Sequence, residues 1–149
     1  MSSFSGSCLC GGILVSISSN PVTIFTCFCD HCCKGAGGTH QVIAKFTHKS
    51  VAITTGSDLV SHFTLNNTSS GLAKEKAFCR VCGTPLWTAP ASAQGQFLLI
   101  RTSLLDGGTA LTSLGTRSNL TPEAEVFVKS RPAWQHAVDG AVQWEGMRR

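Results

Sequence analysis

Seven of the eight cysteines lie in three short clusters whose spacing suits metal binding. The clusters are Cys8-x-Cys10, Cys27-x-Cys29-x-x-Cys32 and Cys79-x-x-Cys82. Four thiolates complete the tetrahedral coordination of a structural zinc ion, whereas three leave one position for water or substrate. The sequence therefore predicts two Zn²⁺ ions per chain, one in a closed structural site and one in an open site where chemistry takes place.

Disulfides are the main alternative use of so many cysteines. Cysteines one residue apart, such as Cys8 and Cys10, point to opposite faces of a strand and bridge each other badly. The start, Met1–Gly6, has neither a charged n-region nor an apolar h-region, so it does not indicate a secretory signal. The chain has 149 residues, 42% of them hydrophobic, which is enough for a core without disulfides. We therefore expect reduced, metal-binding cysteines in a cytoplasmic protein.

The outer two clusters suit the closed site, and their four residues are called the four-cysteine group: Cys8, Cys10, Cys79 and Cys82. The x-x spacing of the later pair lets both sulfurs reach one metal from a tight turn, and Gly83 allows the backbone of that turn to bend. A shared metal would tie the N-terminal strand to the middle of the chain and stabilise the fold. The alternative is two buried cysteine pairs without a metal.

The middle cluster, called the three-cysteine group, consists of Cys27, Cys29 and Cys32. Its spacing can wrap three thiolates round one face of a metal and leave the opposite face accessible. Alternatively, His31 or Cys33 supplies a fourth ligand and makes this a second structural site. A catalytic zinc acidifies a bound water, or holds a thiolate and polarises a carbonyl. Three thiolates leave a net charge near −1, which favours a soft thiolate or a polarised C=O as the ligand.

Two polar residues inside the middle cluster are the candidate proton-transfer groups. Asp30 and His31 can relay protons if they face the open position, and they form an ordinary solvated turn if they do not.

The remaining pattern is mostly that of strands. Short segments rich in Val, Ile, Thr and Phe are separated by Gly, Ser, Asn or Pro. Pro132–Val138 shows weak helical periodicity, and Asn66–Gly71 and Ala89–Gly95 are typical of exposed loops. The sequence predicts one mainly β domain over residues 1–149, with layered antiparallel sheets. The predicted strands are Ile13–Ile17, Val22–Thr26, Gln41–Phe46, Val51–Thr55, Leu59–Leu65, Lys76–Cys79, Phe97–Arg101 and Glu125–Lys129.

Charge and hydropathy favour a small-molecule partner. The formal charge is +4, but seven thiolates and two divalent ions together lower it by three, to about +1. Lys and Arg are scattered apart from Arg148 and Arg149, so nucleic acid is not the expected partner. No stretch approaches the roughly 18 apolar residues of a membrane span, so no membrane partner is expected. The oligomeric state is not predictable from the sequence.

The chain resembles the glutathione-dependent formaldehyde-activating enzyme family, which also contains centromere protein V. The resemblance covers nearly the whole chain and includes the triple-cysteine cluster. Its other motifs are Gly6-x-Cys8-x-Cys10-Gly11, Phe78–Trp87 with its Cys-Arg-Val-Cys-Gly-Thr-Pro-Leu run, Ile100–Asp106 and Phe127–Trp134.

The resemblance implies an Mss4-like fold of layered antiparallel β-sheets with zinc-binding loops. It implies a structural zinc on the four-cysteine group and a catalytic zinc on the three-cysteine group. It also implies carbon–sulfur chemistry, the addition of a thiol such as glutathione to an aldehyde or the reverse.

Two residues depart from the family's pattern and become the candidate substrate-binding residues. Phe28 occupies the position between the first two cysteines of the triple cluster, where similar members commonly have His. Cys33 and then Lys34 follow the third cysteine, where an Arg is frequent. Lys34 offers a point charge rather than a planar fork. A bulkier or more apolar carbonyl or thioether would suit Phe28 at least as well as formaldehyde.

We therefore expect a zinc-dependent carbon–sulfur lyase that acts on a small thiol–carbonyl adduct, glutathione–aldehyde-like or a metabolite analogue. One alternative is an isomerase or dehydratase that uses the same metal as a Lewis acid on a small metabolite. The other is a non-catalytic, zinc-stabilised binding module.

Overall fold

The computed structural model describes residues 3–107 and 120–148 and confirms the mainly β fold. The described residues form two sheets. The smaller one is antiparallel, with the order β1 (Phe4–Ser7), β2 (Leu14–Ile17) and β5 (Val51–Thr55). The larger one has the order β11 (Val142–Gln143), β10 (Ala124–Val126), β3 (Thr23–Cys27), β4 (Gln41–Thr47), β9 (Phe97–Arg101), β8 (Pro85–Pro90), β7 (Lys74–Cys79) and β6 (Val60–Leu65).

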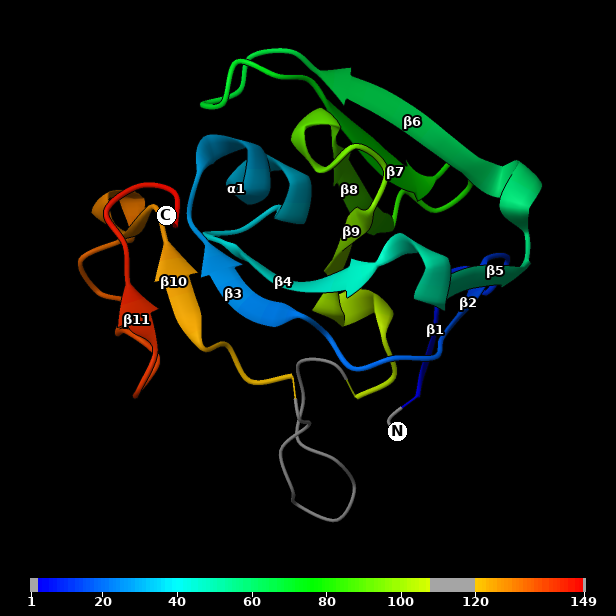
Figure 1. Ribbon diagram of the computed structural model, residues 1–149, viewed down its shortest axis with the longest axis horizontal. Coiled ribbons are helices and arrows are strands. Elements are labelled where there is room, and N and C mark those ends of the chain that lie inside the picture. The colour runs from blue at the N-terminus through cyan, green and yellow to red at the C-terminus, as the bar shows by residue number, and fades with distance from the viewer. Residues whose placement is uncertain (1–2, 108–119, 149) are drawn as a thin grey trace.

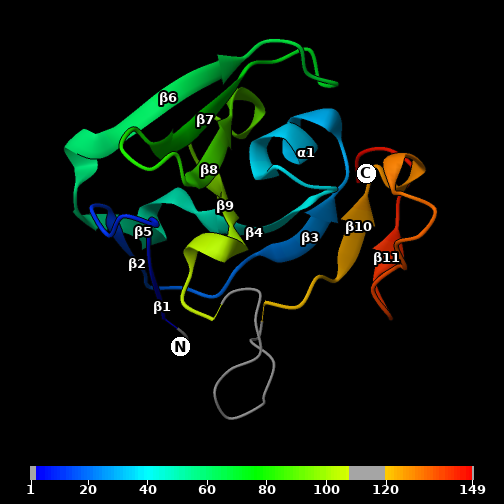
Figure 2. The same ribbon diagram turned by 180° about the vertical axis from the view of Figure 1, so that it is seen from behind.

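The larger sheet is mixed. Every pair in the run β3-β4-β9-β8-β7-β6 is antiparallel. β10 runs parallel to both of its neighbours, β3 and β11. The sheet bends round the short helix α1 (Asp30–Ala36), which follows β3 directly and lies beside β4 (Figures 1 and 2). The 3-10 turns are His48–Ser50, Ser57–Leu59, Ala91–Ala93, Thr102–Leu104 and Val128–Ser130. No helix among the described residues is long and apolar enough to cross a membrane.

Alternation along the strands separates a core face from a second face of the large sheet. In β4, Ala44 and Phe46 belong to the main core, and in β9, Leu98 and Ile100 do the same. Side chains of a strand alternate between faces, so the intervening residues of β4 and β9 lie on the opposite side. That opposite side carries a smaller core and the candidate site described below. The smaller core consists of Phe25, Cys27, Cys32, Ile43, Ala124 and Val126.

The small sheet is joined closely to the rest of the main core. A Cβ added to Gly6 in β1 would lie 2.2 Å from the Leu104 carbonyl oxygen, so this approach requires glycine. Ile13, Val15 and Ile17 are buried in the same core as Phe46. The sequence segment that begins the chain is therefore held against the strands that carry the later cysteines.

The predicted strands agree with β2 to β7, β9 and β10 apart from their ends. Three predictions differ from the structure: a helix, the end of one strand and the start of one loop. Pro132–Val138 is not helical: the Val138 N–H donates to the Glu125 carboxylate at 2.8 Å instead of to a helical carbonyl. The strand predicted to reach Lys129 ends at Val126, because Phe127 adopts a left-handed φ of 56°. Of the predicted loop Ala89–Gly95, Ala89 and Pro90 still belong to β8, and Ala91–Ala93 forms a 3-10 turn. Of the predicted domain 1–149, residues 1–2, 108–119 and 149 lie outside the described part.

Candidate metal centres

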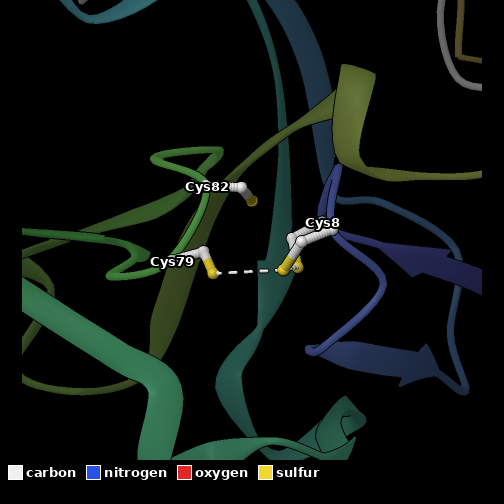
Figure 3. Close-up of side chains that lie close together, drawn as sticks. Cys8, Cys79 and Cys82 are labelled. Atoms are coloured by element: carbon white, nitrogen blue, oxygen red, sulfur yellow. Dashed lines mark hydrogen bonds between the residues drawn. The ribbon is translucent and has the colours of Figure 1, made fainter.

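The four-cysteine group assembles from two turns far apart in the chain. Cys8 and Cys10 follow β1, Cys79 ends β7, and Cys82 lies in the turn before β8. Their four sulfur atoms all lie within 4.8 Å of one another. In Figure 3 the sulfurs of Cys79 and Cys82 face the N-terminal segment that carries Cys8. The two predicted half-sites therefore meet.

The spacing of these sulfurs fits a tetrahedral zinc site. Zinc–sulfur bonds of about 2.3 Å place tetrahedral sulfurs about 3.8 Å apart. The Sγ atoms of Cys8 and Cys10 are 3.5 Å apart, and those of Cys10 and Cys79 are 3.9 Å apart. All eight cysteines are free thiols, so no disulfide competes for these sulfurs. This group can hold a metal ion, and the donor set is consistent with zinc.

Backbone and hydroxyl donors favour the thiolate form of two members of the group, Cys8 and Cys82, whose pKa values are lowered. The Ile13 N–H donates to the Cys8 Sγ at 3.2 Å. The Thr84 hydroxyl lies 3.2 Å from the Cys82 Sγ, and contacts with Thr84 lower the pKa of the Cys82 thiol to about 5. Thr84 also accepts from the Leu9 N–H at 3.0 Å, which links the two turns. Such supporting hydrogen bonds orient metal ligands.

The three-cysteine group lies at the junction of β3 and α1. Cys27 ends β3, Cys29 precedes the first residue of α1, and Cys32 is one turn into the helix. Residues three apart lie on the same face of a helix, so Cys29 and Cys32 point together toward Cys27. The three sulfurs lie within 4.8 Å of one another, and this group too can hold a metal ion.

The three thiols are close enough to share protons. Hydrogen bonds from Cys27 and Cys32 lower the pKa of the Cys29 thiol to about 2. The same hydrogen bond raises the pKa of the Cys27 thiol, because its proton is held between the two sulfurs, so the three thiols do not all ionise without a counter-charge. A cation between the sulfurs removes this conflict, as a structural or catalytic metal does.

Two residues considered as a fourth ligand are placed differently. Cys33 is directed away from the group, and its Sγ donates to the carbonyls of Thr39 at 3.0 Å and Phe28 at 3.4 Å. His31 lines a cavity next to the group. Among the described residues, the group that can hold the metal comprises the three cysteines alone.

That cavity has a volume of about 260 Å³, and the three-cysteine group forms part of its wall. Asp30 and His31 line it, so both candidate proton-transfer residues face the space beside the cysteines. Apolar walls come from Phe25, Ile43, Leu65, Leu99, Phe127 and Met147, and polar ones from Asn67, Ser69, Lys74, Lys76, Thr88 and Arg101.

The two candidate substrate-binding residues are not among the lining residues. Phe28 is completely buried, and its ring packs 5.4 Å from that of His40, centroid to centroid. Lys34 is exposed in the last turn of α1. In this structure Phe28 supports the metal loop from the interior, and Lys34 faces solvent.

A buried arginine takes the place beside the cysteines that Lys34 was expected to occupy. Arg101 is 7% exposed, and its two Nη atoms donate to the Leu99 carbonyl at 2.8 Å and the Thr88 hydroxyl at 2.5 Å. Its buried Nε has no hydrogen-bond partner among the described residues. Burial lowers the pKa of this guanidinium, whereas the negative charge of the three-cysteine group raises it.

Lys76 is a second cation at the same cavity. Burial lowers the pKa of its ammonium group, nearby Arg101 lowers it further, and Cys32 raises it. Neither Arg101 nor Lys76 was predicted from the sequence as part of the site. The available signal was a charged residue at the end of the apolar Phe97–Arg101 strand and a Lys-x-Lys alternation in β7.

The described part is thus a mainly β scaffold with two cysteine groups that can each hold a metal ion and a cationic cavity beside one of them. The family model for the glutathione-dependent formaldehyde-activating enzyme matches residues 3–130, and the chain belongs to this family. The family is enzymatic in general, and it indicates glutathione-dependent formaldehyde activation or related carbon–sulfur chemistry.

A solved structure shares the fold. A crystal structure of a Rhodobacter sphaeroides protein from a structural genomics programme is 16% identical in sequence, with a TM-score of 0.56. The similarity covers 69% of this chain and 88% of the other. No curated protein sequence matches the chain significantly.

Proposed function

We propose that this chain is a zinc-dependent lyase-type enzyme that forms or breaks the C–S bond of a small thiol–carbonyl adduct. The observation that carries the proposal is the three-cysteine group in the wall of a cavity that also contains Arg101 and Lys76. In this proposal the four-cysteine group holds a structural zinc and the three-cysteine group a catalytic one. A cytoplasmic location is part of it, since free cysteines suit a reducing compartment.

The charges of the site suit an anionic sulfur. When bound, the zinc ion supplies Lewis acidity and stabilises a thiolate over a thiol. Three thiolates with a divalent ion carry a net charge near −1, so a substrate thiolate brings the site near −2. Arg101 and Lys76 together supply two positive charges at the same cavity. The chain therefore provides the compensation that a bound thiolate needs.

The chain's own groups can also move the proton of the reaction. In the cleavage direction, the C–S bond of the adduct breaks and its electron pair stays on sulfur. The adduct's hydroxyl becomes the carbonyl, and its proton passes to His31 or Asp30, both of which line the cavity. Phe25 and Leu99 provide apolar walls that limit the access of water. Thiol addition is the reverse of these steps.

The function is tested with zinc-loaded protein and mixtures of a thiol with an aldehyde, glutathione with formaldehyde among them. We expect faster approach to the adduct equilibrium from both sides, measured by NMR, and loss of this acceleration after metal removal. Turnover of thiol-free hydroxycarbonyl compounds alone would favour the isomerase or dehydratase. Absence of turnover together with failure of any thiol to bind would favour the binding module.

Replacing Arg101 with methionine is expected to lower kcat/KM for the adduct by about tenfold to a hundredfold. Methionine keeps much of the buried volume but removes the positive charge and the Nε donor that has no partner among the described residues. One charge-assisted hydrogen bond contributes about 1.5–3 kcal/mol, a factor of about ten to a hundred. Steady-state kinetics measures the effect, with metal content and thermal midpoint as checks on folding. Arg80→Met, at an exposed arginine, is the matched control. An unchanged kcat/KM in a folded, zinc-loaded Arg101 variant would contradict the proposed role.

Replacing Gly35 with alanine is expected to displace Lys76 with little loss of stability. A Cβ at Gly35 would lie 2.9 Å from the Lys76 Nζ and 3.1 Å from the Gln41 Nε2, and both atoms end flexible side chains that can move. Alanine favours a helix over glycine by about 0.8–1 kcal/mol, which offsets the displacement. We expect mercaptoacetate to bind about threefold to tenfold more weakly, because a cation leaves the cavity. Gly38→Ala, where an added Cβ meets nothing within 4 Å, is the control in the calorimetric titration.

A further inference from the structure

A second cavity adjoins the one beside the three-cysteine group. Its volume is about 670 Å³, against about 260 Å³ for the metal cavity. Five residues line both: Phe25, Ser69, Lys74, Leu99 and Met147. The two cavities therefore meet at a boundary with three apolar side chains, Phe25, Leu99 and Met147, and two polar ones, Ser69 and Lys74.

Strand register makes the two cavities parts of one continuous sheet face. Phe97, Leu99 and Arg101 alternate along β9 and so lie on one face. Lys45 of β4 pairs with Leu99 of β9. This pair lies two residues along each strand from the Ile43–Arg101 pair, which lines the metal cavity. Two residues along a strand span about 7 Å. A chain that starts beside the cysteines thus reaches the Lys45 row after a short apolar stretch.

The second cavity is cationic. Lys45, Lys74 and Arg148 line it, and the only carboxylate in the lining of either cavity, within the described part, is that of Asp30 in the metal cavity. The Lys45 ammonium lies 4.2 Å from the centroid of the Phe97 ring, which holds the lysine over the sheet. Arg148 is positioned by a hydrogen bond from its Nη1 to the Thr23 hydroxyl at 2.8 Å.

We propose that the second cavity is a substrate subsite, and that the preferred substrate thiol bears an apolar spacer with a distal carboxylate. This inference rests on the proposed function, because the thiol end occupies the metal cavity. The carboxylate lies among Lys45, Lys74 and Arg148, and the spacer crosses the boundary at Leu99. At that boundary three apolar side chains (Phe25, Leu99 and Met147) stand against two polar ones (Ser69 and Lys74), so an apolar spacer matches it better than a peptide, whose amide groups lose hydrogen bonds to water. The site therefore prefers an unbranched thiol acid to glutathione.

Calorimetric titration of the zinc-loaded protein with four thiols tests this subsite. Mercaptohexanoate has both the spacer and the carboxylate, mercaptohexanol lacks the carboxylate, and mercaptoacetate lacks the spacer; glutathione has a peptide spacer. We expect mercaptohexanoate to bind about tenfold or more tightly than each of the others, a difference that corresponds to about 1.4 kcal/mol. Zinc content is measured after each titration, so that removal of metal by a thiol is not mistaken for binding.

Variants locate the advantage in the second cavity. Lys45→Met and Lys74→Met each remove one charge while keeping the aliphatic stem, and are expected to weaken mercaptohexanoate about threefold to tenfold. Lys45 lines only the second cavity, so the Lys45 variant is not expected to change the binding of mercaptohexanol. Lys49→Met, at an exposed lysine outside both cavities, is the matched control.

The possible outcomes separate this inference from the proposed function. Equal affinities for mercaptohexanoate and mercaptohexanol, tighter binding of glutathione, or an advantage that survives both lysine variants overturns the subsite while leaving thiol binding in place. Failure of all four thiols to bind the zinc-loaded protein overturns the proposed function, and the subsite with it.

Discussion

Serine at position 29 is expected to abolish turnover and to remove about one equivalent of zinc while leaving the fold intact. Cys29 is half-buried at the start of α1, and its sulfur is one of three within 4.8 Å of one another. Serine is a poor zinc ligand at neutral pH, since its hydroxyl stays protonated. Losing a Lewis acid that contributes about 4 kcal/mol to the transition state lowers the rate about a thousandfold. Kinetics and metal analysis on the same preparation measure both effects.

The control for Cys29→Ser is Cys33→Ser. Cys33 lies four residues further on, within α1, but its thiol donates to carbonyls and does not belong to the group. We expect two equivalents of zinc and near-normal turnover in that variant. Retained turnover in the Cys29 variant, at one equivalent of zinc, would show that the reaction does not depend on the three-cysteine group.

The two cysteine groups could be predicted because their chemistry is visible in local spacing. Three clusters containing seven thiols divide naturally into four and three. The structure brings together the same two sets. Strand predictions succeeded for the same local reason: β4, β5 and β9 are rich in branched and aromatic residues, which favour strands in any context.

The cations of the cavity could not be predicted, because they come together only through strand pairing. Lys76 in β7 faces Thr88 in β8, Thr88 faces Leu99 in β9, and Arg101 is two residues further on. The order β4-β9-β8-β7 decides this arrangement, and a sequence pattern does not reveal sheet order. Lys34 looked better placed only because it is near Cys32 in sequence. On α1 it points to solvent instead.

The missed elements have weak local signals. β1 has the sequence Phe-Ser-Gly-Ser and is defined mainly by its pairing with β2. β8 begins and ends with proline, which argues against a strand in isolation. α1 has seven residues including Gly35, too few for a helix to be stable without tertiary contacts. Pairing with neighbouring strands stabilises β1 and β8, and packing against β4 stabilises α1.

Serine at position 82 is expected to destabilise the whole domain rather than one activity. Cys82 and Cys79 hold the β7–β8 turn opposite Cys8 and Cys10, so a metal there closes a loop of about seventy residues. Structural zinc contributes about 10–16 kcal/mol in small zinc-binding peptides, against a total stability of about 5–15 kcal/mol for a typical domain. We expect extensive unfolding, or a Tm lowered by about 15 °C or more, in circular dichroism melts.

Comparison of the Cys82 and Cys29 variants tests the division of labour between the two groups. Each variant should lose zinc, but only the Cys82 variant should lose cooperative unfolding, because its group joins the N-terminal segment to the β7–β8 turn. The three-cysteine group lies within a span of six residues, so a metal there closes no long loop. Such a metal therefore stabilises the fold little through the chain entropy of loop closure. Unchanged thermal stability of Cys82→Ser would refute a structural role for the four-cysteine group. A Cys29 variant as unstable as the Cys82 variant would instead make both groups structural, and the cavity beside Arg101 would then need another explanation.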